Sequence, residues 1–172
     1  AQAQSALAIA TVPYGIERKV EDTLHQLMSG AIEVLNDADA ALVGGHTSEG
    51  AELALGVSVN GFAPKEKILR KAGMMPGNVL ILTKPLGTGT LFAADMQQKA
   101  KGRWIEGALA SMVQSNRLAA EAVYAHGATA CTDITGFGLL GHMVEMIRPS
   151  GVDVAINLDA LPVMDGALDT IA

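Results

Sequence analysis

The 172-residue chain has a single cysteine, few aromatic residues (3%) and few charged ones (17%). One cysteine cannot form a disulfide within the chain, which excludes a disulfide-stabilised scaffold. The chain is instead 49% hydrophobic, mostly in small aliphatic residues, which excludes intrinsic disorder. No apolar run approaches the roughly 18 residues of a membrane span, and no secretory signal is recognisable. We therefore expect a globular, cytoplasmic protein with no membrane partner.

Basic residues are especially scarce in the first third of the chain. Residues 1–62 contain two basic and eight acidic side chains and so carry the whole net charge of −6, whereas residues 63–172 are neutral. This balance argues against a nucleic-acid partner, because phosphates require a basic patch. A phosphate-containing ligand would need metal ions to offset the repulsion.

Both ends of the sequence look like cuts in a longer polypeptide. The chain begins without Met and enters an apolar run after four residues. Leu168 and Ile171 stand at helical spacing with no Gly or Pro stop signal after them. We expect a fragment, with a short processed or tagged protein as the alternative.

Hydrophobic periodicity predicts strands and helices that alternate along the chain. Up to residue 62 we expect, in order, a strand at 5–12, a helix at 16–35, a short strand at 41–45, a loop and a strand at 53–59. Beyond Pro64 we expect helices at 65–71, from 87–90 onward, at 103–126 and at 135–148, and strands at 79–83, 129–132 and 152–158. The alternation indicates an α/β or α+β sandwich.

The first of three glycine-rich segments is VGGHTSEG, residues 43–50. Gly44 and Gly45 would let a ligand approach the backbone, and His46 and Thr47 add polar groups beside them. Exposed N–H groups on such a loop suit phosphate oxygens. An ordinary tight turn between two strands is the alternative.

The second segment is TKPLGTGT, residues 83–90, which lacks the spacing of a Walker A loop. Its Lys84 is within reach of an anion. The alternative is a helix N-cap made by Thr88 or Thr90.

The third segment, CTDITGFGLLGH at residues 131–142, contains a G-x-G-x-x-G pattern. Gly136, Gly138 and Gly141 allow a dinucleotide-binding interpretation. However, Asp133 would repel a pyrophosphate at the helix N-terminus, whereas the same carboxylate suits Mg²⁺ bridged to phosphate oxygens. A helix N-cap or Asx turn is the alternative for Asp133. Cys131 is expected to be packed rather than reactive.

Together, three motifs resemble those of the selenophosphate synthetase (selenide, water dikinase) family, and the likeness runs over nearly the whole chain. They are GGHTSEGAELALGVSVNG, ILTKPLGTGTLFAA and CTDITGFGLLGHMVEM, at residues 44–61, 81–94 and 131–146. The wider superfamily includes aminoimidazole ribonucleotide synthetase, thiamine-monophosphate kinase and a hydrogenase maturation factor.

The resemblance implies a two-domain α/β (α+β sandwich) fold of the aminoimidazole ribonucleotide synthetase type. Residues 1–62 would be the remnant of an N-terminal ATP-binding domain, whose sheet pairs across a homodimer. Residues 63–172 would be a mixed-sheet C-terminal domain, truncated at its end. In the family, ATP lies between the two domains.

The reaction implied by the resemblance converts ATP, selenide and water to selenophosphate, AMP and phosphate, with Mg²⁺ required. Gly44, Gly45, His46 and Thr47 match the nucleotide-contacting loop of the family, and Asp133 matches a magnesium-binding aspartate. The family's N-terminal Cys (or selenocysteine), its Lys and its other magnesium aspartates have no counterpart here. We therefore expect no catalytic residue in this chain and no activity by the chain alone.

Three alternatives remain open from the sequence. One is another ATP-using member of the same superfamily. Another is a dinucleotide-binding module built on Gly136, Gly138 and Gly141, and the last is a non-catalytic module that only dimerises. We also predict dimers or larger species, because the strands at 5–12 and 53–62 are expected to be exposed sheet edges.

Overall fold

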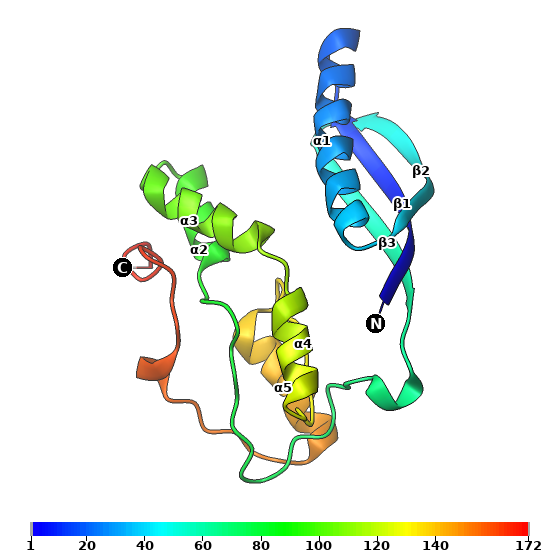
Figure 1. The fold of residues 1–172 in the computed structure, drawn as a ribbon. Coiled ribbons are helices and arrows are strands. Elements are labelled where there is room, and N and C mark those ends of the chain that lie inside the picture. The colour runs from blue at the N-terminus through cyan, green and yellow to red at the C-terminus, as the bar shows by residue number, and fades with distance from the viewer. Residues whose placement is uncertain (1, 172) are drawn as a thin grey trace. The chain divides into compact units, whose positions relative to one another are not determined.

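The computed structural model describes residues 2–171. The chain divides into two compact units, one ending at Ile68 and the other beginning at Leu69 (Figure 1). No helix within residues 2–171 is both long enough and apolar enough to cross a bilayer.

The first unit is a three-stranded mixed sheet with one long helix. In chain order its elements are β1 (Gln2–Pro13), α1 (Glu17–Asp37), β2 (Ala41–Gly50) and β3 (Ala54–Phe62), followed by a 3-10 turn at Lys65–Lys67. The strand order is β2-β1-β3, with β2 parallel and β3 antiparallel to β1. The predicted α/β class is confirmed, and the mixed sheet of the described residues lies in this first unit.

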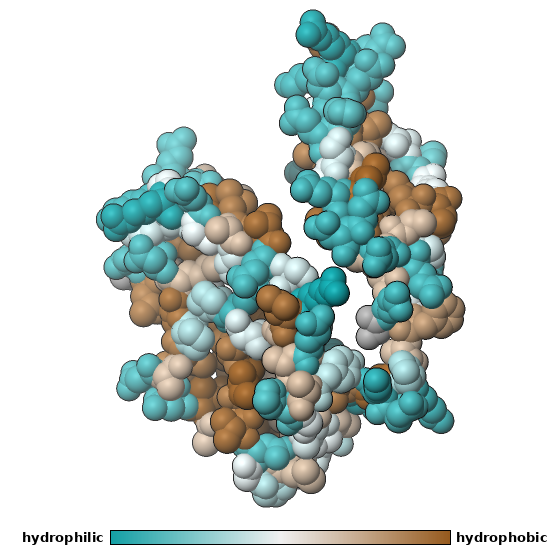
Figure 2. Space-filling view, viewed as in Figure 1, coloured by the Kyte–Doolittle hydropathy of each residue, from teal (hydrophilic) through white to brown (hydrophobic). Residues whose placement is uncertain are grey.

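Helix α1 covers one face of this sheet and packs on β1 and β2 (Figure 1). Small side chains alternate along β1 on that face and are buried, namely Ala6, Ala8, Ala10 and Val12. The predicted apolar helix face is half-buried against them from Val20 to Leu35, whereas Ile16 is exposed. The viewed side of α1 is mostly hydrophilic (Figure 2), as expected for an amphipathic helix.

Two predictions for the first unit are wrong. The segment 43–50 is not a loop or a turn, because β2 runs through it to Gly50 and pairs with β1 along its length. The first strand is not an edge, because it lies between β2 and β3. The glycines suggested a turn, but hydrogen bonding to β1 holds them in extended backbone instead.

The second unit is mainly helical. It contains α2 (Thr88–Met96), α3 (Gly102–Val113), α4 (Arg117–Ala125) and α5 (Gly138–Ser150), with a 3-10 turn at Leu158–Ala160. Its core joins α2 and α3 to the segment after the 3-10 turn, through the buried residues Leu91, Trp104, Ala108, Met164 and Ala167. Gly127 ends α4 with a positive φ of 65°, as the predicted left-handed stop requires.

The strands and the mixed sheet predicted for the C-terminal part are not formed. Within residues 69–171 the only ladder contact is an isolated parallel bridge between Leu86 and Val163. The segments 79–83, 129–132 and 152–158 have the apolar composition or alternation of strands, but they find no strand to pair with. Val79 and Ile81 remain 83% exposed as a result.

Three helix predictions also need correction. The helix expected at 65–71 is only the 3-10 turn, and the one expected at 103–126 is split into α3 and α4. The Ser115 hydroxyl accepts a hydrogen bond from the backbone N–H of Arg117 at 3.2 Å, which helps to start a new helix there. The last turn of α5 includes Pro149, and the helix ends at Ser150, capped by Gly151 in left-handed backbone.

Candidate functional site

The four residues predicted to contact a nucleotide line one cavity of the first unit. Its volume is about 190 Å³. Gly44, Gly45, His46 and Thr47 of β2 form one wall, and the remaining lining residues are Ala8, Ala10, Met28 and Leu42. The cavity therefore lies where α1 meets β1 and β2.

Strand alternation separates the polar side chains of this segment. Thr47 is paired with Ala10, whose side chain is buried under α1, so Thr47 belongs to the helix-covered face. His46 is paired with Ile9, which is 59% exposed on the opposite face. The side chain of Thr47 therefore stands on the face that holds the cavity, whereas the side chain of His46 stands on the opposite face of the sheet.

Gly45 lies close against the backbone of β1. A Cβ atom at this position would overlap the backbone carbonyl of Ala8. At Gly44, by contrast, a Cβ would meet only the Leu7 side chain, at 3.4 Å. Only one of the two glycines is therefore required by close packing of backbone.

The extended backbone changes what this segment can do chemically. In a glycine loop, successive N–H groups can converge on one anion. Along a strand they point alternately to the two sides, and those facing β1 are already paired. Within the described sheet β2 is an edge strand. To a ligand it can present the backbone N–H and C=O groups that point away from β1, the flat surface of the two glycines and the Thr47 hydroxyl.

Asp133 lies in the second unit, in the loop that precedes α5. It is exposed, and no hydrogen bond or ion pair of its carboxylate occurs within residues 2–171. It is not a helix N-cap, because α5 is capped by Phe137. The described residues contain no cluster of three or more His, Cys, Asp or Glu side chains that could hold a metal ion. Asp133 is thus a single oxygen donor open to solvent.

The same loop is held by a side-chain network that the sequence did not reveal. The buried ring of His142 lies 3.0 Å from the backbone nitrogen of Thr135 at Nε2, and 3.1 Å from Oε2 of Glu145 at Nδ1. Lys71 donates to the same Glu145 oxygen at 2.5 Å. The pKa of Glu145 is lowered by the hydrogen bond from Lys71 first and by that from His142 second. The His-x-x-Glu spacing on one helix was the only available signal, because Lys71 is remote in sequence.

Two further residues were given roles by the sequence, Lys84 and Cys131. The Nζ of Lys84 donates to the carbonyl oxygens of Ser111 and Gln114 at 2.9 and 2.5 Å, so two of its three donors are already used within the protein. It caps the C-terminal end of α3, where a cation is favourable. Cys131 is exposed rather than packed.

The caps proposed in the second glycine-rich segment are also not formed. Helix α2 is capped by Gly87 at φ 134°, without a side-chain hydrogen bond from Thr88 or Thr90. The Thr90 hydroxyl donates instead to the carbonyl of Gly87 at 2.9 Å.

The third segment lacks the context of a dinucleotide-binding fingerprint. Such a fingerprint needs a strand that runs directly into the glycine turn. Residues 129–132 form no strand, and Gly138 is the first residue of α5. The fold therefore does not support a dinucleotide site at Gly136, Gly138 and Gly141.

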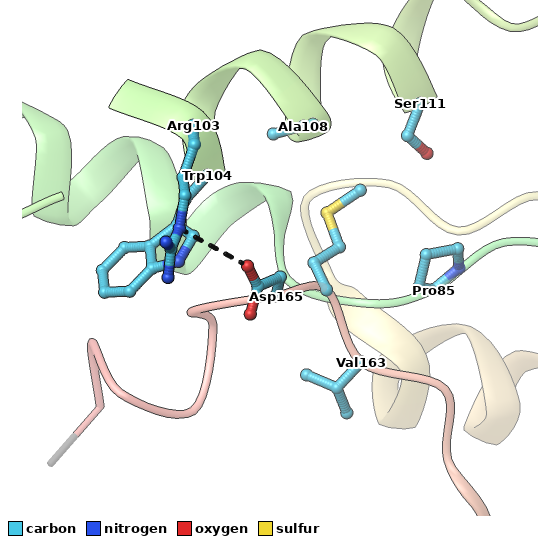
Figure 3. A pocket seen from close by; sticks show the side chains of 9 residues that line it. Pro85, Arg103, Trp104, Ala108, Ser111, Val163 and Asp165 are labelled. Atoms are coloured by element: carbon cyan, nitrogen blue, oxygen red, sulfur yellow. Dashed lines mark ion pairs between the residues drawn. The ribbon is translucent and has the colours of Figure 1, made fainter. Parts of the chain in front are cut away.

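A second cavity, which no prediction covered, lies within the second unit (Figure 3). It measures about 260 Å³, and its walls are mainly apolar, with Trp104 and Met164 among them. Arg103 and Asp165 form an ion pair at 3.9 Å beside it. None of the predicted site residues contributes to this cavity.

Comparison with known proteins places these features in a family. Residues 75–171 match the model described as "AIR synthase related protein, C-terminal domain". The chain belongs to the AIR synthase-related family. It is also 44% identical over 151 residues to a protein of Trichlorobacter lovleyi named "Selenide, water dikinase", covering 88% of this chain and 44% of the relative. The predicted resemblance is confirmed, and the chain spans less than half the length of the curated relatives it matches.

Solved structures confirm the fold at lower identity. Thiamine-monophosphate kinase from Stenotrophomonas maltophilia is 21% identical, with a TM-score of 0.79 over 96% of this chain and 53% of that one. HypE of E. coli, a hydrogenase maturation protein, is 17% identical, with a TM-score of 0.80 over 98% and 52%. AaThiL, complexed with AMPPCP and TMP, is 16% identical, with a TM-score of 0.71 over 98% and 53%. These neighbours share the aminoimidazole ribonucleotide synthetase-like fold.

Proposed function

We propose that this chain is part of a selenophosphate synthetase, which converts ATP, selenide and water to selenophosphate, AMP and phosphate. The observation that carries the proposal is the 44% identity to a selenide, water dikinase across 88% of the chain. The three solved structures of the same fold compared above are far less similar, at 21% identity or below. The test is to express the full-length protein containing this sequence in a strain that lacks selenophosphate synthesis. Rescue is expected, and failure to rescue would favour another ATP-using member of the family.

In this proposal residues 1–62 are the remnant of an ATP-binding domain, and the segment Gly44–Thr47 contacts the nucleotide. A solved structure of the same fold, AaThiL, contains AMPPCP, and the cavity beside β2 exposes the Thr47 hydroxyl and the glycine backbone. Loss of one hydrogen bond should weaken binding about tenfold. We expect Thr47→Ala to weaken Mg-AMPPCP binding by that factor in calorimetry. Thr23→Ala removes a hydroxyl that bonds only to its own helix and should leave the affinity unchanged.

Residues 63–172 would be the truncated C-terminal domain, in which Asp133 holds Mg²⁺. The residue fits one position of such a site, because its carboxylate is exposed and has no partner within the described residues. Mg²⁺ commonly takes one or two protein carboxylates together with phosphate oxygens and water. Bound there, the ion would neutralise phosphate charge during phosphoryl transfer.

We further propose that the chain alone does not complete the reaction. It offers one unpartnered aspartate of the proposed metal set, and the described residues contain no cluster of metal ligands. The expected result is no selenide-dependent formation of AMP from ATP by the isolated chain. Measured turnover would overturn this part of the proposal and leave the family assignment intact.

A homodimer is the proposed assembly. Strand β3 is an edge of the described sheet and is exposed along its whole length. Its Leu55, Val57 and Val59 pair with the buried alanines of β1 yet remain 38–53% exposed. Such an apolar edge favours pairing with another copy. Light scattering should give at least the dimer mass, and a monomer at high concentration would contradict the proposal.

A further inference from the structure

We infer that His142 is a positioning residue that holds the loop carrying Asp133. The inference rests on the proposed function only for what Asp133 binds. The positioning itself follows from hydrogen bonds within residues 71–150. It concerns a buried side chain that is only 5% exposed.

The first step is the protonation state of the imidazole. The backbone N–H of Thr135 can only donate, so Nε2 of His142, 3.0 Å away, must accept and carry no hydrogen. The Glu145 carboxylate accepts from Nδ1 at 3.1 Å, so Nδ1 carries the hydrogen. Both contacts are satisfied by one species, the neutral imidazole protonated at Nδ1.

The second step is what selects that species. Lys71 donates to the same carboxylate oxygen of Glu145, which keeps the carboxylate ionised and able to accept. Lys71 is itself fixed to α5, because the backbone nitrogens of Gly73 and Met74 donate to the Ser150 hydroxyl at 3.1 and 3.2 Å. Two groups therefore favour Nε2 as the acceptor: the Thr135 N–H that donates to it, and the Glu145 carboxylate that takes the hydrogen of Nδ1.

The third step is the consequence for the loop. Thr135 contacts Nε2 of His142 twice. Its backbone N–H donates to Nε2, and its hydroxyl oxygen lies 2.9 Å from the same nitrogen. Thr135 is two residues from Asp133 and is itself exposed, whereas the His142 ring that accepts from it is only 5% exposed. Phe137 lies against the ring, with centroids 5.9 Å apart. The exposed carboxylate thus stands on a loop whose backbone is fixed from beneath.

Two isosteric variants separate the two ring nitrogens. In His142→Gln the amide oxygen can occupy the place of Nε2 and accept from Thr135, but the donor to Glu145 is lost. In His142→Asn the amide nitrogen can replace Nδ1, but nothing reaches Thr135. Both variants bury one amide, so a general loss of stability affects them alike. The matched control is His126→Asn, because His126 is an exposed histidine in the same unit.

The readout is amide hydrogen exchange of Thr135 in the whole 172-residue chain, with the His142 tautomer read from ¹⁵N chemical shifts. One hydrogen bond corresponds to about a tenfold change in exchange. His142→Asn should therefore exchange about tenfold faster than wild type, while His142→Gln and the control stay close to it. Equal exchange at Thr135 in the two His142 variants, or a hydrogen on Nε2 in wild type, would overturn the inference.

A Mn²⁺ titration followed by NMR line broadening tests the proposed metal role of Asp133 separately from the positioning by His142. Outer-shell changes typically weaken metal affinity about 10-fold to 100-fold, so His142→Asn should need at least tenfold more Mn²⁺ to broaden the Gly136 amide signal. If wild type shows no broadening, the metal role of Asp133 fails, and the exchange data still decide the positioning. If wild type binds and both variants bind equally well, the positioning is overturned and the metal role stands.

Discussion

The two segments proposed to meet the nucleotide and its metal are held in opposite ways. Gly44–Thr47 is part of a strand and is fixed by backbone hydrogen bonds to β1. The loop 133–135 has no ladder and is fixed by the side chain of His142. A segment held by backbone hydrogen bonds tolerates many side-chain changes, but not an added atom that overlaps the neighbouring strand. A segment held by a side chain depends on the identity of that one residue.

The largest expected effect is on the backbone-held segment. Gly45→Ala adds a Cβ against the carbonyl of Ala8, and neither strand can move without breaking the ladder. We expect a loss of about 2–3 kcal/mol of stability, the upper range for overpacking, measured by urea denaturation. Gly44→Ala is the matched control, because its Cβ meets only the flexible end of Leu7. Equal losses in both variants would contradict the close-approach argument.

A smaller effect is expected where a side chain holds the loop. Thr135→Val removes the hydroxyl contact to His142 but keeps the backbone N–H that also donates to Nε2. One net hydrogen bond is worth about 1 kcal/mol, so the second unit should lose about that much stability in denaturant. Thr129→Val removes a hydroxyl that bonds to Asn78 on the exposed surface and should cost less. The reverse order would show that the hydroxyl contact between Thr135 and His142 does not stabilise the loop.

A third prediction concerns the titration of the network rather than its stability. The pKa of Glu145 is lowered from its ordinary 4.5, with Lys71 as the main cause. Because the pKa is lowered in the folded protein, the Glu145 carboxylate stays ionised somewhat below pH 4.5. The stability that this ionised group adds is present above pH 4.5 and is lost as the pH falls through the lowered pKa. Lys71→Met should move the NMR titration of the Glu145 carboxyl to higher pH. Lys99→Met, at an exposed lysine of the same unit, should leave the titration where it is.

The same contrast explains how far the sequence could predict the molecule. Strand β1, helix α1 and strand β3 follow from periods of two and 3.6 residues, because each has a regular apolar face. The extension of β2 through Gly44 and Gly45 could not be predicted, since glycine favours turns locally and only pairing with β1 decides otherwise. The strands expected after residue 69 are not formed, for the converse reason. Apolar alternation identifies a segment that could form a strand, but it does not show whether a second strand lies beside it to pair with.

The motif around Asp133 was recognised, but its support was not. A carboxylate at a glycine-rich helix start is visible as a pattern, whereas the His142 network depends on Lys71, which lies 74 residues from Glu145. Which nitrogen of a histidine accepts is a property of its neighbours in space. The sequence could therefore single out the carboxylate proposed to meet a ligand, but not the side chains that hold its loop.

The smallest expected effect on stability sharpens this division. Asp133→Asn changes an exposed side chain whose carboxylate has no hydrogen-bond or ion-pair partner among residues 2–171, so the unfolding free energy should stay within about 0.5 kcal/mol of wild type. Mn²⁺ binding, by contrast, should fall steeply, because the amide lacks the negative charge that a hard cation prefers. Asp153→Asn, at another exposed aspartate of the same unit, is the control and should change neither quantity. Lost stability in Asp133→Asn would show that the carboxylate belongs to the fold; unchanged Mn²⁺ binding would remove it from the proposed metal site.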